Sequence, residues 1–371
     1  MLWLSLILTF IVSFLTIIIA KPIAIKVGLV DKPNYRKRHQ GAIPLLGGIS
    51  LFMGNLCFYL LQWDSTRLPY LYLFCVLVLL IIGLLDDRFD LSAALRAGIQ
   101  AVLSVLMIYF GHLSLEHLGQ IIGPFQITLG PVGFIITVFA TIAIINAFNM
   151  IDGIDGLLGG LSSVSFSAIA ILMLLDGQYD LAVWCFALII ALIPYVMFNL
   201  TIFGKERKIF MGDSGSTLIG FTMIWILLLS TQGKGHPMNP VTALWVIAIP
   251  IIDMIAVIYR RLRKGKSPFK PDRLHVHHLM VRAGLTSRQA LLVITLFSAL
   301  CAGFGILGEV YYINEWIMFI LFIGLFFLYL YSITKAWKVT RFIRRMKRRA
   351  QRRLNQKKSI ILLFGVNYVR K

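Results

Sequence analysis

The chain has 371 residues, of which 58% are hydrophobic and 14% are charged. An average soluble domain has about 25% charged residues, so this sequence lacks the polar residues that would cover a soluble fold of its length. The formal net charge is +20, which fits nucleic acid, anionic lipid or a phosphorylated substrate as partner. A chain that lies mostly in a bilayer is not expected to bind nucleic acid. The four cysteines form no CxxC pair, which excludes zinc and redox motifs of that type.

Apolar runs predict an all-α integral membrane protein, a polytopic bundle of about eleven transmembrane helices. A spanning helix needs about 20 mainly apolar residues, and these runs do not show the two-residue alternation of barrel strands. The first run is expected to be a retained span, because residues 1–20 carry no charge and lack a cleavage site. In chain order, the predicted spans are about 1–20, 45–61, 69–85, 96–111, 131–148, 157–175, 182–200, 214–230, 241–259, 289–307 and 314–336.

The Lys and Arg residues predict the orientation. Cytoplasmic loops carry an excess of these residues, and 31 of the 36 lie in one set of connections, whereas the opposite set holds only Arg67 and Lys234. We therefore expect the N-terminus outside and the C-terminus in the cytoplasm. Residues 1–337 form the predicted transmembrane catalytic domain with cytoplasmic active-site loops, and 338–371 form a basic tail that is expected to lie on anionic membrane lipid. The Lys- and Arg-rich connections are 31–44, 86–96, 149–156, 201–213, 260–288 and the tail.

Carboxylate and amide side chains of the kind found in catalytic sites follow the third and fifth spans. Asp86 and Asp87 are adjacent carboxylates, which suit a divalent cation or a general base, with a solvated helix end as the alternative. In NAFNMIDGIDG, Asn149, Asp152 and Asp155 are spaced by three residues. Their amide and carboxylate oxygens suit a hard cation such as Mg²⁺. The alternative for this segment is a polar turn.

Two further clusters lie on the same predicted face. In FMGDSGS, Asp213 begins the eighth span, where free backbone N–H groups bind anions, although a capped helix start explains the pattern equally well. In the 260–288 loop, seven basic residues precede the HVHH motif, whose histidines suit metal ligation, acid–base chemistry or phosphate binding. Asp253 lies inside the ninth span and is a functional candidate, with pairing to a nearby arginine as the alternative.

Carboxylates, arginines and histidines on one membrane face are typical of phosphoryl transfer to or from a lipid with Mg²⁺. A transporter for a lipid-linked anion is the first alternative, and a structural scaffold is the second. A transporter is expected to have ionisable residues near the middle of its spans. Here only Asp253 lies inside a span, and the outside loops lack a matching polar cluster.

These motifs resemble those of the polyprenyl-phosphate N-acetylhexosamine-1-phosphate transferases of glycosyltransferase family 4. The resemblance runs from Asp31 to about Ala290. The enzyme that transfers phospho-N-acetylmuramoyl-pentapeptide shares part of the pattern but differs at HVHH, so it ranks lower, as does a transferase for another UDP-N-acetylhexosamine. The segments that carry the resemblance are DKPNYRKRHQGAIPLLGG, GLLDDRFDLSAALR, NAFNMIDGIDGL, FMGDSGS and KPDRLHVHHLMVRAGLTSRQA.

The resemblance implies a reaction at the bacterial inner membrane, on its cytoplasmic face. UDP-N-acetylglucosamine and undecaprenyl phosphate would give undecaprenyl-diphospho-N-acetylglucosamine and UMP, the first membrane step of O-antigen, enterobacterial common antigen or a related glycan. The family requires Mg²⁺ or Mn²⁺. Direct displacement by the lipid phosphate is the expected mechanism, with an aspartyl-phosphate on Asp213 as the rival. The sequence leaves the oligomeric state open, with a homodimer as one candidate.

The resemblance also implies roles for individual residues. Asp86 or Asp87 corresponds to the base or orienting group for the lipid phosphate, and Asp213 with Asn149 to the Mg²⁺ site. The catalytic candidates are Asp86, Asp87, Asp213 and His275. The implied substrate-binding residues are Asp152 and Asp155 for the nucleotide and metal shell, Phe210 for stacking on uracil with Asn199 nearby, and Arg96, Arg261, His275, His277 and His278 for phosphate and sugar contacts.

Overall fold

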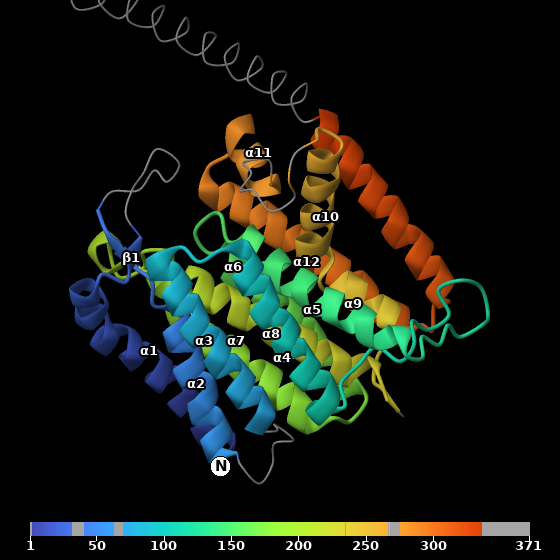
Figure 1. Ribbon diagram of the computed structural model, residues 1–371, viewed down its shortest axis with the longest axis horizontal. Coiled ribbons are helices and arrows are strands. Elements are labelled where there is room, and N and C mark those ends of the chain that lie inside the picture. Colours follow the sequence, from blue (N-terminus) through green and yellow to red (C-terminus); the bar gives the residue numbers. More distant parts are fainter. Residues whose placement is uncertain are drawn as a thin grey trace, which may run out of the picture.

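The computed structural model describes residues 2–31, 41–62, 70–233, 235–265, 267 and 275–335. These residues form a helical bundle (Figure 1), and their one sheet is a short antiparallel pair, β1 (Val30–Asp31) with β2 (Ile43–Pro44). The predicted tail, 338–371, lies outside the described residues. The helices are α1 (Leu2–Val27), α2 (Gly47–Leu61), α3 (Tyr70–Phe89), α4 (Ala93–Gly111), α5 (Val132–Ile151), α6 (Leu157–Leu175), α7 (Tyr179–Asn199), η1 (Lys205–Arg207), α8 (Gly212–Thr231), α9 (Pro240–Val246), α10 (Ala248–Leu262), α11 (Val276–Ala283), α12 (Ser287–Val310) and a last described helix, Glu315–Lys335.

Each of the eleven predicted spans has a helical counterpart in the described chain. Nine helices there are long and apolar enough to cross a membrane, and the pair α9 and α10 makes a tenth if it is counted as one span. Helix α2 has 15 residues and is shorter than a usual span. The chain is therefore a multi-pass membrane protein, while the count of eleven crossings and the sides of the termini stay predictions.

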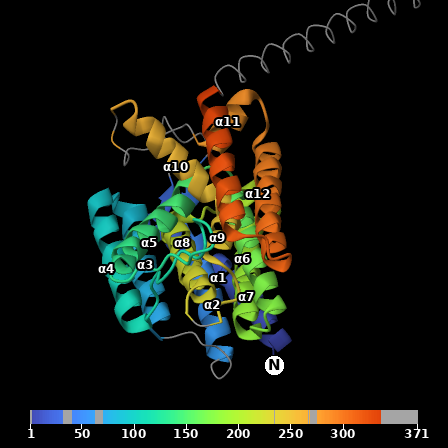
Figure 2. The same ribbon diagram turned by 90° about the vertical axis from the view of Figure 1, so that its right-hand side faces the viewer.

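The ninth predicted span, 241–259, is not a continuous helix. Helices α9 and α10 meet at Ile247 with a bend of 82°. Pro250 has no N–H group to donate to the carbonyl of Val246, four residues earlier, so the helix loses a hydrogen bond at this point. The bend gives α10 a direction that α9 does not share (Figure 2).

Helix α8 lies at the centre of the bundle, where α2, α3 and α5 pack against it and nearly all of its residues are buried. Glycines make this close packing feasible. Gly48 of α2 faces Gly215, Gly83 of α3 faces Ser214, and Gly220 of α8 faces α5; a Cβ at any of the three would come closer than 3.0 Å to the facing backbone. Small residues allow membrane helices to approach in this way.

A buried polar network joins four helices inside the bundle. Asn55 of α2 donates to the hydroxyl of Tyr72 of α3 at 3.3 Å, and that hydroxyl lies 2.9 Å from Thr222 of α8. Trp184 of α7 donates its indole N–H to Asn55 at 3.0 Å. Each group would be costly to bury without a partner, so the network favours one arrangement of these helices.

Replacing Gly83 by alanine is expected to destabilise the bundle, because the new Cβ would press on the backbone of Ser214 and separate α3 from α8. Overpacking of this kind costs about 1–3 kcal/mol, which would lower the midpoint of thermal unfolding in detergent. Gly303 of α12 is the matched control, since no atom lies within 4 Å of a Cβ built there. Equal midpoints for Gly83→Ala and Gly303→Ala would contradict this account of the packing.

Candidate functional site

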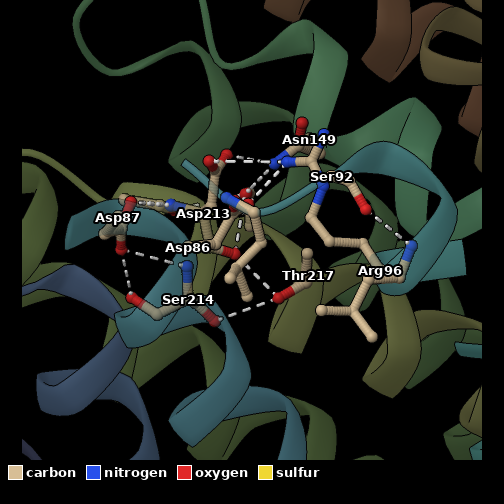
Figure 3. A network of polar contacts seen from close by, with 12 residues as sticks. Asp86, Asp87, Ser92, Arg96, Asn149, Asp213, Ser214 and Thr217 are labelled. Carbon is tan, nitrogen blue, oxygen red and sulfur yellow. Dashed lines mark hydrogen bonds and ion pairs between the residues drawn. The ribbon is translucent and has the colours of Figure 1, made fainter. Parts of the chain in front are cut away.

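Polar side chains from α3, α4, α5 and α8 converge where α3 ends and α8 begins (Figure 3). The group brings together five residues that the sequence analysis singled out in four separate segments. The structure links them by direct hydrogen bonds and ion pairs, described below. We call them the carboxylate cluster: Asp86, Asp87, Arg96, Asn149 and Asp213.

Asp87 caps the first turn of α8. Its carboxylate accepts the backbone N–H of Asp213 at 2.7 Å and the backbone N–H and hydroxyl of Ser214 at 3.3 and 3.0 Å. Gly212 permits this approach, because its φ is +78° and a Cβ there would meet the carboxylate. Of the two interpretations of FMGDSGS, the structure shows the capped helix start, since Asp87 occupies the N–H groups of Asp213 and Ser214.

Asp86 and Asp213 share one arginine. Asp86 is buried and binds Nη1 of Arg96 at 2.5 Å, and it also accepts the N–H of Leu91 at 2.8 Å. The same Nη1 lies 3.7 Å from Asp213. Ser92 caps α4 by accepting the N–H of Leu95 at 3.2 Å, which places Arg96 in the first turns of that helix. The arginine thus lies between two carboxylates, with a third of its side chain exposed.

Asn149 joins the end of α5 to Asp213. Its side-chain amide donates to the Asp213 carboxylate at 2.6 Å and to the hydroxyl of Ser216 at 2.9 Å. The Asp213 side chain remains 39% exposed, so a ligand can reach it. No group of three His, Cys, Asp or Glu side chains in the described ranges is placed to hold a metal ion by itself. The donor set fits Mg²⁺ rather than a protein-enclosed metal, since Mg²⁺ commonly uses one or two carboxylates together with substrate phosphates and water.

Asp155 and Phe210 meet at Lys208. The ammonium of Lys208 lies 2.7 Å from Asp155 and 5.0 Å from the centre of the Phe210 ring, so it binds both the carboxylate and the face of the ring. The backbone of Phe210 is fixed by its N–H donating to Pro44 and by its carbonyl accepting from Leu46, at 2.9 and 3.1 Å. The Phe210 ring is half-buried, as a stacking surface would be.

Asn199 is 2% exposed and connects two loops. Its oxygen accepts the N–H of Gly156 at 2.6 Å, and its nitrogen donates to the carbonyl of Ile209 at 2.9 Å. Both ends of the amide are thus used inside the protein. This geometry favours a bracing role, which holds the 152–156 loop against the segment that carries Phe210, over the direct substrate contact that the resemblance implies.

The HVHH segment begins α11 and lies against the α5–α6 loop. His277 is 1% exposed, and its ring packs on Gly153, where an added Cβ would collide with it. Neither ring nitrogen of His277 has a hydrogen-bond partner among the described residues. Burial, helped by the nearby His278, lowers the pKa of His277 to about 3, so this histidine is uncharged at neutral pH. Its neutral ring and its burial favour a packing role.

His275 lies beside Asp253, with its Nδ1 2.7 Å from the carboxylate. The structure thus pairs Asp253 with a histidine. His278 is half-buried with its ring 4.2 Å from that of His277, and Arg261 is 5% exposed. All thirteen residues expected at the site are described. The packing of His277 on Gly153 brings the HVHH segment against the loop that follows Asn149 of the carboxylate cluster.

Three contributors were not identified from the sequence. Ser214 is within a quoted motif, but its bond to Asp87 depends on tertiary structure. Lys208 lies in a Lys- and Arg-rich connection, where its charge was attributed to membrane orientation. Tyr329 donates to Asp253 from the last helix, in a run that showed only apolar character.

Comparison with known proteins identifies the family. The pattern of glycosyl transferase family 4 matches residues 70–231, which include the carboxylate cluster. The chain is 73% identical to the undecaprenyl-phosphate alpha-N-acetylglucosaminyl 1-phosphate transferase of Haemophilus influenzae over 94% of its own length and 99% of that protein. The proteins of the same name from Pasteurella multocida and Escherichia coli K12 are 72% and 58% identical, over 94% of this chain and 98% and 95% of theirs. The chain therefore belongs to glycosyl transferase family 4, among the transferases of this name.

Proposed function

We propose that this chain transfers N-acetylglucosamine 1-phosphate from UDP-N-acetylglucosamine to undecaprenyl phosphate, giving undecaprenyl-diphospho-N-acetylglucosamine and UMP. The observation that carries this proposal is the carboxylate cluster, in which an exposed Asp213 lies beside Arg96 and Asn149 at the end of an apolar bundle. The names of the relatives support the acceptor and the sugar. The site would lie on the cytoplasmic face of the bacterial inner membrane, in line with the distribution of Lys and Arg.

Asp213 is the proposed ligand of Mg²⁺ or Mn²⁺, with Asn149 next to it. The bound ion would supply positive charge to the diphosphate oxygens and to the departing UMP. Asp87 holds the first turn of α8, so it fixes the backbone of the residue that carries the ligand. We therefore assign Asp87 a positioning role, because its carboxylate is already engaged by N–H and O–H donors.

Arg96 is the proposed contact for a phosphate oxygen. Asp86 holds its Nη1, and the remaining guanidinium donors can bind phosphate in the bidentate manner that arginine favours. The acceptor needs little help from a general base, since a phosphate monoester has a second pKa near 6 and is largely a dianion at neutral pH. Among the two roles implied for Asp86, orientation therefore fits the ion pair better than proton abstraction.

The Lys208, Asp155 and Phe210 group is the proposed nucleotide site. The Phe210 ring offers a face for uracil, and Lys208 offers positive charge for the diphosphate once a substrate competes with Asp155. In the proposed step, an oxygen of undecaprenyl phosphate bonds to the β-phosphorus of the nucleotide sugar. The bond from that phosphorus to the bridging oxygen breaks, and UMP leaves with the electron pair.

Purified protein in detergent with undecaprenyl phosphate and Mg²⁺ is expected to release UMP from UDP-N-acetylglucosamine and to form a lipid-linked sugar product. UDP-N-acetylmuramoyl-pentapeptide, supplied separately, should give neither. Product from the pentapeptide substrate alone would assign the peptidoglycan reaction instead. Folded protein that releases no UMP with either donor would contradict the transferase proposal and favour a transporter of a lipid-linked anion.

The change Asp213→Asn should reduce kcat by about 100- to 1,000-fold, the loss typical when a group that stabilises transition-state charge is removed. The amide keeps the shape of the side chain, so the thermal midpoint should stay close to that of the wild type. Asp180→Asn is the matched control, because Asp180 is exposed in the first turn of α7, away from the cluster. Near-normal turnover of Asp213→Asn across a Mg²⁺ titration would rule out the metal assignment.

Direct displacement is expected to invert the configuration at the β-phosphorus. A donor made chiral at that phosphorus with oxygen isotopes and sulfur, followed by analysis of the lipid product, measures this outcome. Retention would mean two successive displacements, and it would support the aspartyl-phosphate route through Asp213.

A further inference from the structure

One buried carboxylate connects the HVHH segment to the last described helix. Asp253 of α10 is 1% exposed and accepts three hydrogen bonds. The donors are Nδ1 of His275 at 2.7 Å, the backbone N–H of Val276 at 3.0 Å and the hydroxyl of Tyr329 at 2.5 Å. Tyr329 lies on the helix Glu315–Lys335, outside the segment that matches the family pattern.

Asp253 provides the cap that α11 lacks. The residue at the cap position is His275, and its side chain makes no capping bond of its own. A helix start leaves N–H groups unsatisfied, and a carboxylate placed there is favourable for both hydrogen bonding and charge. By accepting the N–H of Val276, Asp253 fixes where α11 begins, and therefore fixes the position of the histidines that follow.

The same contact determines the state of the His275 ring. With Nδ1 held by Asp253, only Nε2 of this ring is left to bind another group. A carboxylate at Nδ1 fixes the orientation of the ring and places a proton on Nδ1. The charged and titratable groups around this pair are Asp253 and Arg260 on α10, His277 and His278 on α11, and Tyr329 on the last helix.

His277, next to His275, adds little positive charge that would repel a proton on His275. The ring of His277 is parallel to that of His275 with 5.7 Å between centres, and its pKa is lowered to about 3 by burial. It is therefore neutral where the enzyme works. Tyr329 weakens the electrostatic effect of Asp253 on His275, because its hydroxyl donates a hydrogen bond to the carboxylate and partly neutralises its negative charge.

We propose that Asp253 and Tyr329 are positioning residues of the transfer reaction: Asp253 binds Nδ1 of His275 and orients the ring so that Nε2 can bind a phosphate oxygen of the substrates, and Tyr329 holds Asp253 and moderates its negative charge. The proposal rests on the proposed function for the identity of those substrates. We call the arrangement of Asp253, His275 and Tyr329 the clamp, and its geometry depends only on the contacts of Asp253. It assigns a role to a tyrosine in an otherwise apolar helix.

The clamp predicts opposite pH shifts for two substitutions. If protonated His275 is the active form, kcat falls as pH rises through its pKa. Asp253→Asn removes the negative charge, so that fall should move to lower pH by about one unit or more. Tyr329→Phe removes the competing donor from the carboxylate, so the fall should move to higher pH by a smaller amount. A merely structural role for either residue would lower activity without these opposite shifts.

The measurement is the pH profile of UMP release by the full-length protein, with thermal unfolding as the check on folding. Tyr331→Phe is the matched control, because Tyr331 is on the same helix and is 60% exposed; its profile should equal that of the wild type. If folded Asp253→Asn loses kcat at the same high pH as the wild type, the proposal is overturned. If that variant does not fold, Tyr329→Phe decides the question. A fall of kcat that stays at the same pH or moves to lower pH in Tyr329→Phe also overturns the proposal.

A second measurement separates this proposal from the proposed function. The pKa of His275 can be followed without substrate by NMR of protein labelled at histidine, with the resonance assigned by its absence in His275→Gln. The same opposite shifts are expected in Asp253→Asn and Tyr329→Phe. Their presence in a protein that does not release UMP would support the clamp and contradict only the function, whereas their absence would overturn the clamp whatever the activity.

Discussion

The hydrogen bonds from the start of α8 to Asp87 are the constraint on which the rest of the site depends. They hold α3 against α8 at the point where Gly83 and Ser214 touch, and they fix the backbone of Asp213. Asp213 then meets Arg96 from α4 and Asn149 from α5. One carboxylate cap thus brings four helix ends together. The two adjacent carboxylates are therefore not equivalent, since Asp87 accepts hydrogen bonds from the backbone of α8 and Asp86 forms an ion pair with Arg96.

The same principle recurs on the other side of the site. Asp253 caps α11 from a neighbouring helix, as Asp87 caps α8. In both places a carboxylate of one helix accepts N–H groups at the start of another helix, which would otherwise be unsatisfied in a medium with little water. Gly153 and His277 connect the two halves through close packing. The polar groups of this end are therefore largely engaged with one another, and Asp213 and Arg96 are among those left partly exposed to a ligand.

Much of the architecture could be predicted from local sequence. Long apolar runs predict helices because lipid leaves the backbone no other partner, and each predicted run has a helix. The bend at Ile247 was missed because the hydropathy of 241–259 is continuous, although Pro250 is the physical signal for it. The carboxylate cluster was predicted as a group, since its members lie at helix ends on one face. The engagement of the α8 N–H groups by Asp87 was not, because it joins residues 126 positions apart.

The sequence by itself determined the class of protein and its apolar helices, and it predicted that the polar motifs lie in one set of connections, because these features follow from composition and from charge counted along the chain. Only the tertiary structure decided which polar side chains face a ligand and which hold the protein together. The resemblance implies that Asn199 and His277 bind substrate, yet both are buried against other loops. Tyr329 lies in an apolar run, yet it donates a hydrogen bond to Asp253. The physical reason is that hydrogen-bond partners are set by distance in space, which a pattern along the chain does not record.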